Sequence, residues 1–225
     1  IPQQVGLAGS SAIITATLYA LLEFYGIDMP LPVQPTFVLA VEGALGIAGG
    51  LQDRVIQCYE GMVYMDFAQE KRKTVAGLTH YNYEPMDPAL LPPIYVAYHA
   101  ALSEPTEVFH NDIRSRYNRG DPQIVKAMKD FAQLAQDGRQ AILERDTARL
   151  SQLIDENFDL RNSISSLAPW QTQMIECARS CGASAKFAGS GGAIIGVYQD
   201  QAMFQALTSR LEAVGSRVIK PQIFP

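Results

Sequence analysis

Two segments rich in glycine and serine, one near each end of the chain, have the composition of oxyanion-binding loops. The first spans residues 6–12 and precedes an apolar run, and the second spans residues 186–192 between two short apolar runs. Glycine leaves room for successive backbone N–H groups to converge on a phosphate, and a helix N-terminus adds a favourable dipole. The pattern favours a phosphate-handling protein, although a Gly-Ser segment before a helix is, taken alone, more often only a helix cap.

Two carboxylates follow the first glycine segment. Glu42 is expected in the last turn of a helix, where the dipole disfavours an anion, and its local sequence holds no cation. Either a bound Mg2+ or exposure to solvent would compensate its charge. Asp53 is expected in the first turn of the next helix, where backbone N–H groups keep a carboxylate ionised. An ionised carboxylate is suited to act as a base, but this position is also typical of an ordinary helix acid.

The first glycine segment matches neither of two common nucleotide-binding motifs. The chain contains no Gly-x-x-x-x-Gly-Lys followed by Ser or Thr, and no Gly-x-Gly-x-x-Gly. The segment instead ends in Ser10 and Ser11, whose hydroxyls can cap backbone N–H groups or reach a phosphate-bound Mg2+. Cys177 and Cys181 have helical i,i+4 spacing, but a zinc site would need two more ligands nearby, so buried thiols are the better interpretation.

The composition indicates a globular protein. The chain has 225 residues, of which 48% are hydrophobic and 18% charged, and its formal net charge is -5. This charge argues against a broad nucleic-acid or anionic-membrane surface, because such surfaces need clustered Lys and Arg. We find no apolar run of about 20 residues that would cross a bilayer and no signal-peptide pattern. We therefore expect a cytoplasmic protein without a nucleic-acid or membrane partner.

Hydrophobic periodicity and breaker residues predict an α+β chain. Prolines at positions 85, 88, 92 and 93 place the expected domain boundary near residue 90. Before it, we predict helices over residues 12–25, 36–45 and 51–59 and a strand over 62–67. After it, we predict helices over residues 122–145, 148–162, 169–181 and 201–214 and strands over 94–98, 185–187, 193–198 and 217–223.

Three segments, in the order in which they occur, resemble the signatures of the GHMP small-molecule kinases. Residues 2–12 resemble the second signature, residues 46–54 the segment with the catalytic aspartate, and residues 186–192 the third signature. Residues 86–93 and 157–161 are similar to plant-type glucuronokinases. The resemblance implies a GHMP kinase fold, with a partial ribosomal-protein-S5-domain-2-like N-terminal domain over residues 1–90. Residues 91–225 would form a C-terminal ferredoxin-like α/β sandwich with helical additions.

The resemblance also implies roles for individual residues in transferring the γ-phosphoryl group of ATP to the anomeric hydroxyl of D-glucuronate. Ser11 and Glu42 would hold Mg2+, and Asp53 would accept the hydroxyl proton. The ATP-binding residues would be Gly6, Leu7, Ala8, Gly9, Ser10, Ser11, Ala12, Gly189, Ser190, Gly191 and Gly192. The candidates for sugar contacts are Arg54, Arg161 and Arg116 for the carboxylate and Asp159 for hydroxyls, each of which fits a surface ion pair about as well.

Two departures from the family pattern leave alternatives open. Kinases of this superfamily carry a first signature upstream of the second, so the resemblance leaves three interpretations open: a fragment, a processed product, or one half of a split protein whose missing N-terminal segment is supplied in trans. Ala188 stands where threonine is usual in the third signature. A catalytically inactive sensor of nucleotide and sugar is the main alternative to a sugar kinase. A related decarboxylase or a kinase for a nonsugar alcohol ranks behind it.

Overall fold

The structure is a computed structural model that describes residues 7–47, 49–99, 113–189 and 191–224. Two compact units make up the chain. We call the unit that contains Ala8–Ala89 the N-terminal unit and the unit that contains Leu90–Pro221 the C-terminal unit. The chain passes from the one unit to the other between Ala89 and Leu90.

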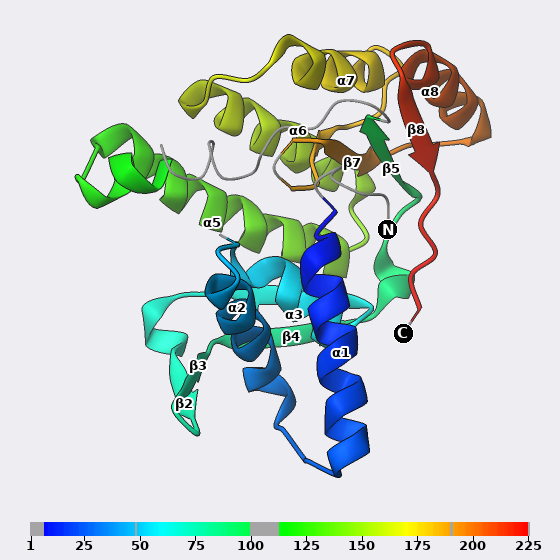
Figure 1. The fold of residues 1–225 in the computed structure, drawn as a ribbon. Coiled ribbons are helices and arrows are strands. Elements are labelled where there is room, and N and C mark those ends of the chain that lie inside the picture. The colour runs from blue at the N-terminus through cyan, green and yellow to red at the C-terminus, as the bar shows by residue number, and fades with distance from the viewer. Residues whose placement is uncertain (1–6, 48, 100–112, 190, 225) are drawn as a thin grey trace. The chain divides into compact units, whose positions relative to one another are not determined.

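Three helices build one part of the N-terminal unit. They are α1 (Gly9–Tyr25), α2 (Gln34–Ala44) and α3 (Leu51–Tyr59), and each contacts the other two (Figure 1). Gly26 ends α1 in the left-handed conformation that glycine adopts without strain, and its N–H bonds to Glu23. The helices meet over buried Leu18, Val38 and Val55. All three predicted helices of this half are confirmed, with ends that shift by no more than a turn.

Two antiparallel hairpin-like pairs complete the N-terminal unit. Strand β1 (Met62–Asp66) pairs with β4 (Asn82–Met86), and β2 (Lys73–Val75) pairs with β3 (Leu78–His80). Tyr83 on β4 is buried, with its ring edge-on to those of Tyr59 and Phe67. The sequence analysis predicts β1 but misses β2, β3 and β4. Strands β2 and β3 have three residues each, and every residue of β2 is exposed.

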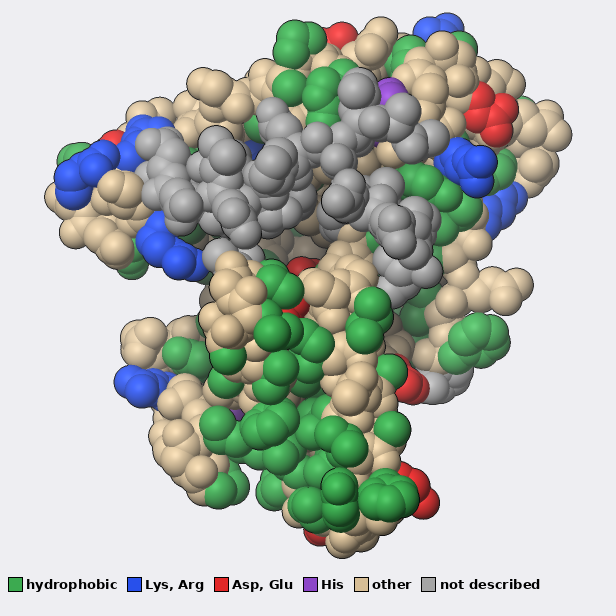
Figure 2. Space-filling model, viewed as in Figure 1, with side chains coloured by type: hydrophobic (Ala, Val, Ile, Leu, Met, Phe, Trp, Pro, Cys, Tyr) green, Lys and Arg blue, Asp and Glu red, His purple; other side chains and the backbone are tan. Residues whose placement is uncertain are grey.

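An apolar surface covers part of the N-terminal unit. Figure 2 shows hydrophobic side chains gathered over α1 and α2. Ile13, Leu21, Phe24 and Leu45 are among the exposed large hydrophobic residues of this unit. A helix that is apolar on nearly all sides is usually covered by further protein, because contiguous exposed patches of this kind mark interaction surfaces.

A four-stranded antiparallel sheet forms the centre of the C-terminal unit. Its spatial order is β6-β7-β5-β8, built from β5 (Ile94–His99), β6 (Lys186–Phe187), β7 (Ala193–Val197) and β8 (Ser216–Ile219). Helices α5 (Pro122–Leu143), α6 (Thr147–Ile164) and α7 (Pro169–Arg179) follow β5 in the chain, and α8 (Gln201–Ala213) connects β7 with β8. This is the β-α-β-β-α-β order of a ferredoxin-like fold with additional helices, and it confirms the predicted architecture.

Aspartate side chains start three of the helices in this unit. The carboxylates of Asp121, Asp146 and Asp200 accept hydrogen bonds from backbone N–H groups in the first turns of α5, α6 and α8. Each bond satisfies a donor that the helix itself leaves unpaired. Asp121 and Pro122 therefore act as the predicted pair that opens the long helix α5. Among the described residues, no helix combines the length and apolarity needed to cross a membrane.

The core of the C-terminal unit depends on a close approach between β7 and the segment before β6. The Tyr95 hydroxyl donates to the Ser184 carbonyl over 2.9 Å, and the Ser184 hydroxyl accepts from the Val197 N–H. Gly196 pairs with Tyr95 across the strands. A Cβ on Gly196 would overlap the Ser184 carbonyl oxygen and lie 2.9 Å from the Tyr95 ring. Only glycine leaves space for this packing.

We therefore expect Gly196→Ala to destabilise the protein by about 1–3 kcal/mol, because the colliding atoms are backbone and a buried ring that cannot move away cheaply. Denaturant unfolding followed by circular dichroism measures this change. The matched control is Gly138→Ala in α5, where a Cβ meets nothing within 4 Å. The control should gain up to about 1 kcal/mol from helix propensity. Equal stability of the two variants would contradict the packing argument.

Candidate active site

The first turn of α1 is an N-terminus without a side-chain cap. Ala8 precedes the helix in the left-handed conformation, with φ 51°, no side chain caps the helix, and its first turn holds no acidic residue. The Ala8 carbonyl accepts from the Ser11 hydroxyl and from Gln57 Nε2 on α3, both over 3.0 Å. The turn is thus held in place from two helices while its N–H groups keep the geometry of an anion site.

A buried ion pair lies beside this turn. Glu42 on α2 is completely buried, and Arg54 on α3 is only 4% exposed. Glu42 Oε2 accepts from Arg54 Nε over 2.5 Å and also contacts Arg54 Nη2, while Glu42 Oε1 accepts from the Ser10 hydroxyl over 2.8 Å. Of the two alternatives for the Glu42 charge, exposure to solvent is therefore wrong. A guanidinium on the next helix compensates it, twelve residues further along the chain.

Arg54 is held by more than Glu42. Its Nη1 atom donates to the Gly50 carbonyl over 2.9 Å and lies 3.4 Å from Asp53 Oδ2. Gly49 makes the room for this side chain, because a Cβ there would lie 2.8 Å from the guanidinium carbon. The glycine pair before α3 thus shapes the pocket of a buried cation. We refer to Ser10, Glu42, Arg54 and Asp53 as the carboxylate network.

Asp53 is the exposed end of the carboxylate network. It lies in the first turn of α3, as predicted, and half of its side chain is exposed. Arg54 Nη1 lies 3.4 Å from Asp53 Oδ2, and backbone N–H groups of the first helical turn lie nearby. An ionised carboxylate that is open to solvent can accept a proton from a bound hydroxyl, whereas the fully buried Glu42 cannot be reached in the same way.

The two serines of the first turn of α1 have different hydrogen-bond partners. Ser11, predicted beside Glu42, is completely buried and turns back to the Ala8 carbonyl. Ser10 is the serine that bonds to Glu42. The sequence analysis also misses Gln57, although it stands three residues after Arg54 and therefore on the same face of α3. The local pattern places both serines in one turn but cannot tell which way each hydroxyl points.

The donor atoms of the carboxylate network suit a magnesium ion that a substrate helps to hold. The described residues contain no group of three or more His, Cys, Asp or Glu that could bind a metal by themselves. Ser10 and Glu42 offer a hydroxyl and a carboxylate oxygen 2.8 Å apart. Mg2+ is commonly bound by one or two protein oxygens together with waters and substrate phosphates. The residues present therefore fit Mg2+ only in combination with a phosphate ligand.

Gly189, Gly191 and Gly192 of the second glycine segment lie between β6 and β7 in the C-terminal unit. Gly191 has φ 128°, and a Cβ there would overlap the side-chain amide of Gln171. Gln171 is itself buried, and its Oε1 accepts from the Ala168 N–H. Arg161 Nη1 donates to the Gly189 carbonyl over 2.7 Å. Gly6 and Ser190, both predicted to contact ATP, lie outside the described residues.

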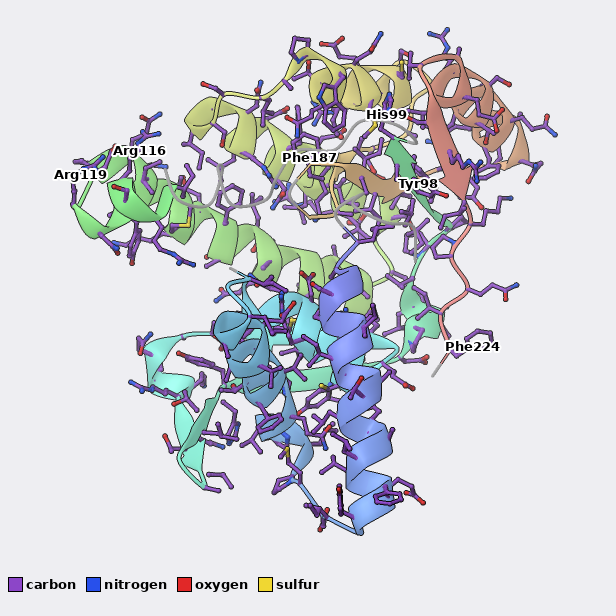
Figure 3. The ribbon with its side chains drawn as sticks, viewed as in Figure 1. Tyr98, His99, Arg116, Arg119, Phe187 and Phe224 are labelled. Atoms are coloured by element: carbon purple, nitrogen blue, oxygen red, sulfur yellow. The ribbon has the colours of Figure 1, made fainter. Side chains whose placement is uncertain are left out.

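Positive charge gathers near these glycines. The Arg161 guanidinium carbon lies 4.7 Å from the centroid of the Phe187 ring, which Figure 3 labels. Burial lowers the pKa of Arg161 to about 10. Burial, and then the charge of Arg161, also lower the pKa of Lys186. Two neighbouring cations near these glycines suit an anionic ligand, so Arg161 keeps its place among the candidates for the sugar contacts.

The other predicted sugar contacts have protein partners. Asp159 accepts from Arg179 Nη1 over 2.7 Å. Arg116, labelled in Figure 3, donates to Asp121 over 2.9 Å and to the Ile164 carbonyl over 3.1 Å. The hydrogen bond from Arg116 is the main reason why the pKa of Asp121 is lowered. These contacts match the ion-pair alternative that the sequence analysis leaves open for both residues.

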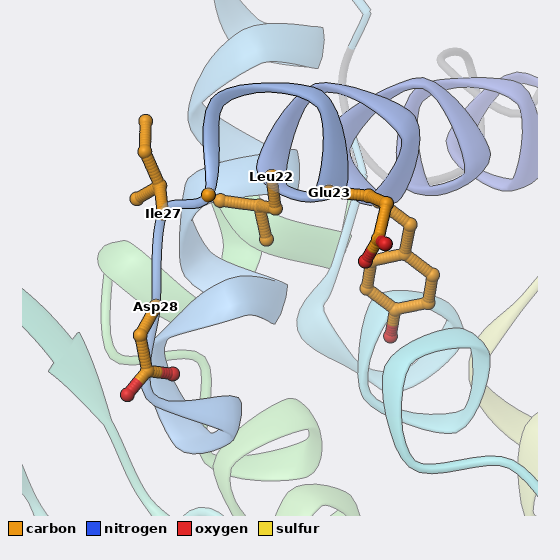
Figure 4. Close-up of a pocket in the computed structure, with 6 residues that line it drawn as sticks. Leu22, Glu23, Ile27 and Asp28 are labelled. Atoms are coloured by element: carbon orange, nitrogen blue, oxygen red, sulfur yellow. The ribbon is translucent and has the colours of Figure 1, made fainter.

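A surface pocket of about 540 Å³ lies at the other end of α1. Tyr19, Leu22, Glu23, Gly26, Ile27 and Asp28 line it (Figure 4). At 1.5 Å per residue, Leu22 is about 20 Å along the helix from its first turn. None of the residues predicted to act in catalysis or binding lines this pocket, so it does not belong to the candidate site.

We expect Gly49→Ala to displace Arg54 from Glu42 and to destabilise the protein by about 1–3 kcal/mol, because a buried guanidinium held by an ion pair has no free space to move into. Thermal unfolding monitored by circular dichroism measures the change. Gly43→Ala on α2 is the control, since a Cβ there meets nothing within 4 Å. A Gly49→Ala protein as stable as this control would show that Arg54 is not confined as described.

The fold and the site together define a class of protein. One unit of this class is ferredoxin-like, and the other carries an uncapped helix N-terminus and a carboxylate network. A family model for the N-terminal domain of GHMP kinases matches residues 1–61, and one for the C-terminal domain matches residues 139–217. Together they match more than half of the chain. The chain belongs to the GHMP kinase family.

Comparisons with individual proteins agree with this assignment. The chain is 44% identical to glucuronokinase 1 and 43% identical to probable glucuronokinase 2, both of Arabidopsis thaliana; each match covers 87% of this chain and 54% of the relative. The chain thus spans about half the length of the curated relatives it matches. The crystal structure of Lactococcus lactis galactokinase complexed with galactose superimposes with a TM-score of 0.72 at 15% identity. That match covers 99% of this chain and 67% of that chain, and shows the fold.

Proposed function

We propose that the chain is part of a sugar-1-kinase that transfers the γ-phosphoryl group of ATP to the anomeric hydroxyl of D-glucuronate. The observation that carries the proposal is the carboxylate network, which presents the half-exposed Asp53 beside a buried Glu42–Arg54 pair and the uncapped start of α1. The 44% identity to glucuronokinase 1 supports glucuronate as the acceptor. Related sugars such as galactose or arabinose are the nearest alternatives.

In this proposal, the first turn of α1 binds the triphosphate through its backbone N–H groups. Anions are stabilised at such a position because the N–H groups and the helix dipole both point at them. Ser10 and Glu42 would hold Mg2+, which when bound neutralises phosphate charge. The glycines between β6 and β7, with Arg161 bonded to the Gly189 carbonyl, would supply further contacts to anionic groups of the substrates.

Asp53 is the proposed base. Phosphoryl transfer needs little covalent help from the protein, so positioning and charge neutralisation supply most of the rate. The remaining task is to take the proton from the attacking hydroxyl, and Asp53 is the half-exposed carboxylate of the network. Arg54 already contacts both Glu42 and Asp53, so Arg161 is the better candidate for the glucuronate carboxylate.

The proposal includes a further polypeptide that packs against the N-terminal unit. The exposed apolar face of α1, which includes Ile13, Leu21 and Phe24, supports it. A face of this composition gains free energy when another polypeptide removes it from water.

We expect ATP consumption that depends on added glucuronate, and we expect Asp53→Asn to lower kcat by about 10²–10⁴-fold because a general base contributes rate of this order. A coupled assay of ADP release measures both. Asp28→Asn, at an exposed aspartate outside the network, is the control and should keep the wild-type rate. Full activity of Asp53→Asn would remove Asp53 from the mechanism. Calorimetric binding of ATP and glucuronate without product would favour the sensor.

The two serines should differ in their effect on the metal requirement. Ser10→Ala removes the hydroxyl beside Glu42, so the Mg2+ concentration at half-maximal rate should rise about tenfold, which corresponds to about 1.4 kcal/mol. Ser11→Ala removes only a bond to the Ala8 carbonyl and should leave this concentration within about twofold, at a stability cost of about 1 kcal/mol. A Mg2+ titration of the rate distinguishes them. A larger effect of Ser11→Ala would restore Ser11 as the metal ligand.

A further inference from the structure

The Glu42–Arg54 pair raises a question about how a metal ion reaches Glu42. Both carboxylate oxygens of Glu42 already have partners, Ser10 on one side and Arg54 on the other. The pair is buried, with Glu42 completely enclosed and Arg54 4% exposed. Glu42 therefore has a full positive charge next to it when no metal is bound.

A divalent cation that binds Glu42 must approach this guanidinium. The metal ion and the Arg54 guanidinium repel each other strongly, because little water screens the two charges at a buried site. This repulsion reduces the free energy that the metal ion gains from binding the Glu42 carboxylate. The Arg54 side chain cannot easily swing away, because it donates to the Gly50 carbonyl and to Glu42 and because the Gly49 backbone lies against it.

For a cation that is bound to a nucleotide, the balance between electrostatic repulsion and attraction at Arg54 is different. The phosphates of ATP carry more negative charge than one divalent ion neutralises, so the complex as a whole is an anion. The Arg54 charge then opposes the metal but attracts the phosphates. The same residue thus disfavours the free ion and tolerates the ion that arrives with its nucleotide.

We propose that Arg54 is the internal counter-ion of the metal site, which keeps Glu42 neutralised and makes the site bind a divalent cation together with nucleotide phosphates rather than alone. This inference rests on the proposed function for the assignment of Glu42 as a metal ligand. Arg54 acts through Glu42 and is a positioning residue. A purely structural Arg54 would stabilise the fold without changing the affinity for free metal.

The test measures Mn2+ binding to the purified chain without nucleotide, by the loss of the free-ion signal in electron paramagnetic resonance. Wild type should bind weakly. Arg54→Met removes the charge but keeps much of the bulk and should bind Mn2+ at least tenfold more tightly. Arg54→Lys keeps the charge and should bind as weakly as wild type. Equal affinities of wild type and Arg54→Met would overturn the proposal.

Thermal unfolding gives a second readout that does not depend on the first. Arg54→Met leaves Glu42 buried without a counter-ion, so its midpoint should fall and saturating Mn2+ should restore most of the loss. The double variant Glu42→Gln/Arg54→Met buries no charge at either position and should not respond to Mn2+. If Arg54→Met is insoluble with and without Mn2+ while the double variant folds, the metal does not replace Arg54 and the proposal fails.

These measurements separate the inference from the proposed function, because neither needs turnover. A chain that shows no sugar-dependent ATP consumption, but whose Arg54→Met variant gains Mn2+ affinity, contradicts the kinase proposal and supports the counter-ion. An active chain whose Mn2+ affinity does not change in Arg54→Met supports the kinase and contradicts the counter-ion.

Discussion

The buried ion pair between Glu42 and Arg54 is the constraint on which the candidate site depends. Burying two charges costs several kcal/mol for each ion, and the cost is recovered only when the geometry is good and the remaining polar atoms find partners. The structure meets both conditions, since Ser10 and the Gly50 carbonyl take up further hydrogen bonds of the pair. The pair links α2 to α3, and Ser10 extends the link to the first turn of α1. The half-exposed Asp53 is thereby held at the edge of a rigid arrangement.

Glycine has the same role in both units, which is to leave space for another group. Gly49 gives room to the Arg54 guanidinium, Gly191 to the Gln171 amide and Gly196 to the Ser184 carbonyl. Only Gly191 among these has a backbone conformation that itself favours glycine. Gly191 belongs to the glycine segment at residues 186–192, so this segment is also a packing feature. The two roles are compatible, because a backbone without side chains can lie close to a buried side chain on one side and a ligand on the other.

Much of the fold could be predicted from local sequence. The residues 51–59 are a helix with the predicted ends because Gly50 and Gly61 flank a run with strong 3.6-residue periodicity, and α5 opens at the predicted Asp-Pro pair. Asp53 falls in the first turn of α3 for the same local reason. The hairpin of β2 and β3 was missed because its strands have three residues each, which is too short for an alternating pattern to be recognised.

The sequence by itself determined the helices of the N-terminal unit, the order of the motifs along the chain and the position of Asp53 in its helix. Caps, breakers and periodicity act over only a few residues, so they can be recognised locally. Only the tertiary structure decided that Glu42 is buried, that Arg54 rather than solvent compensates it, and that Ser10 rather than Ser11 completes the contact. The physical reason is that desolvation and ion pairing depend on which helices pack together. The residues next to Glu42 and Arg54 in the sequence do not indicate that these two side chains, twelve positions apart and on different helices, form an ion pair.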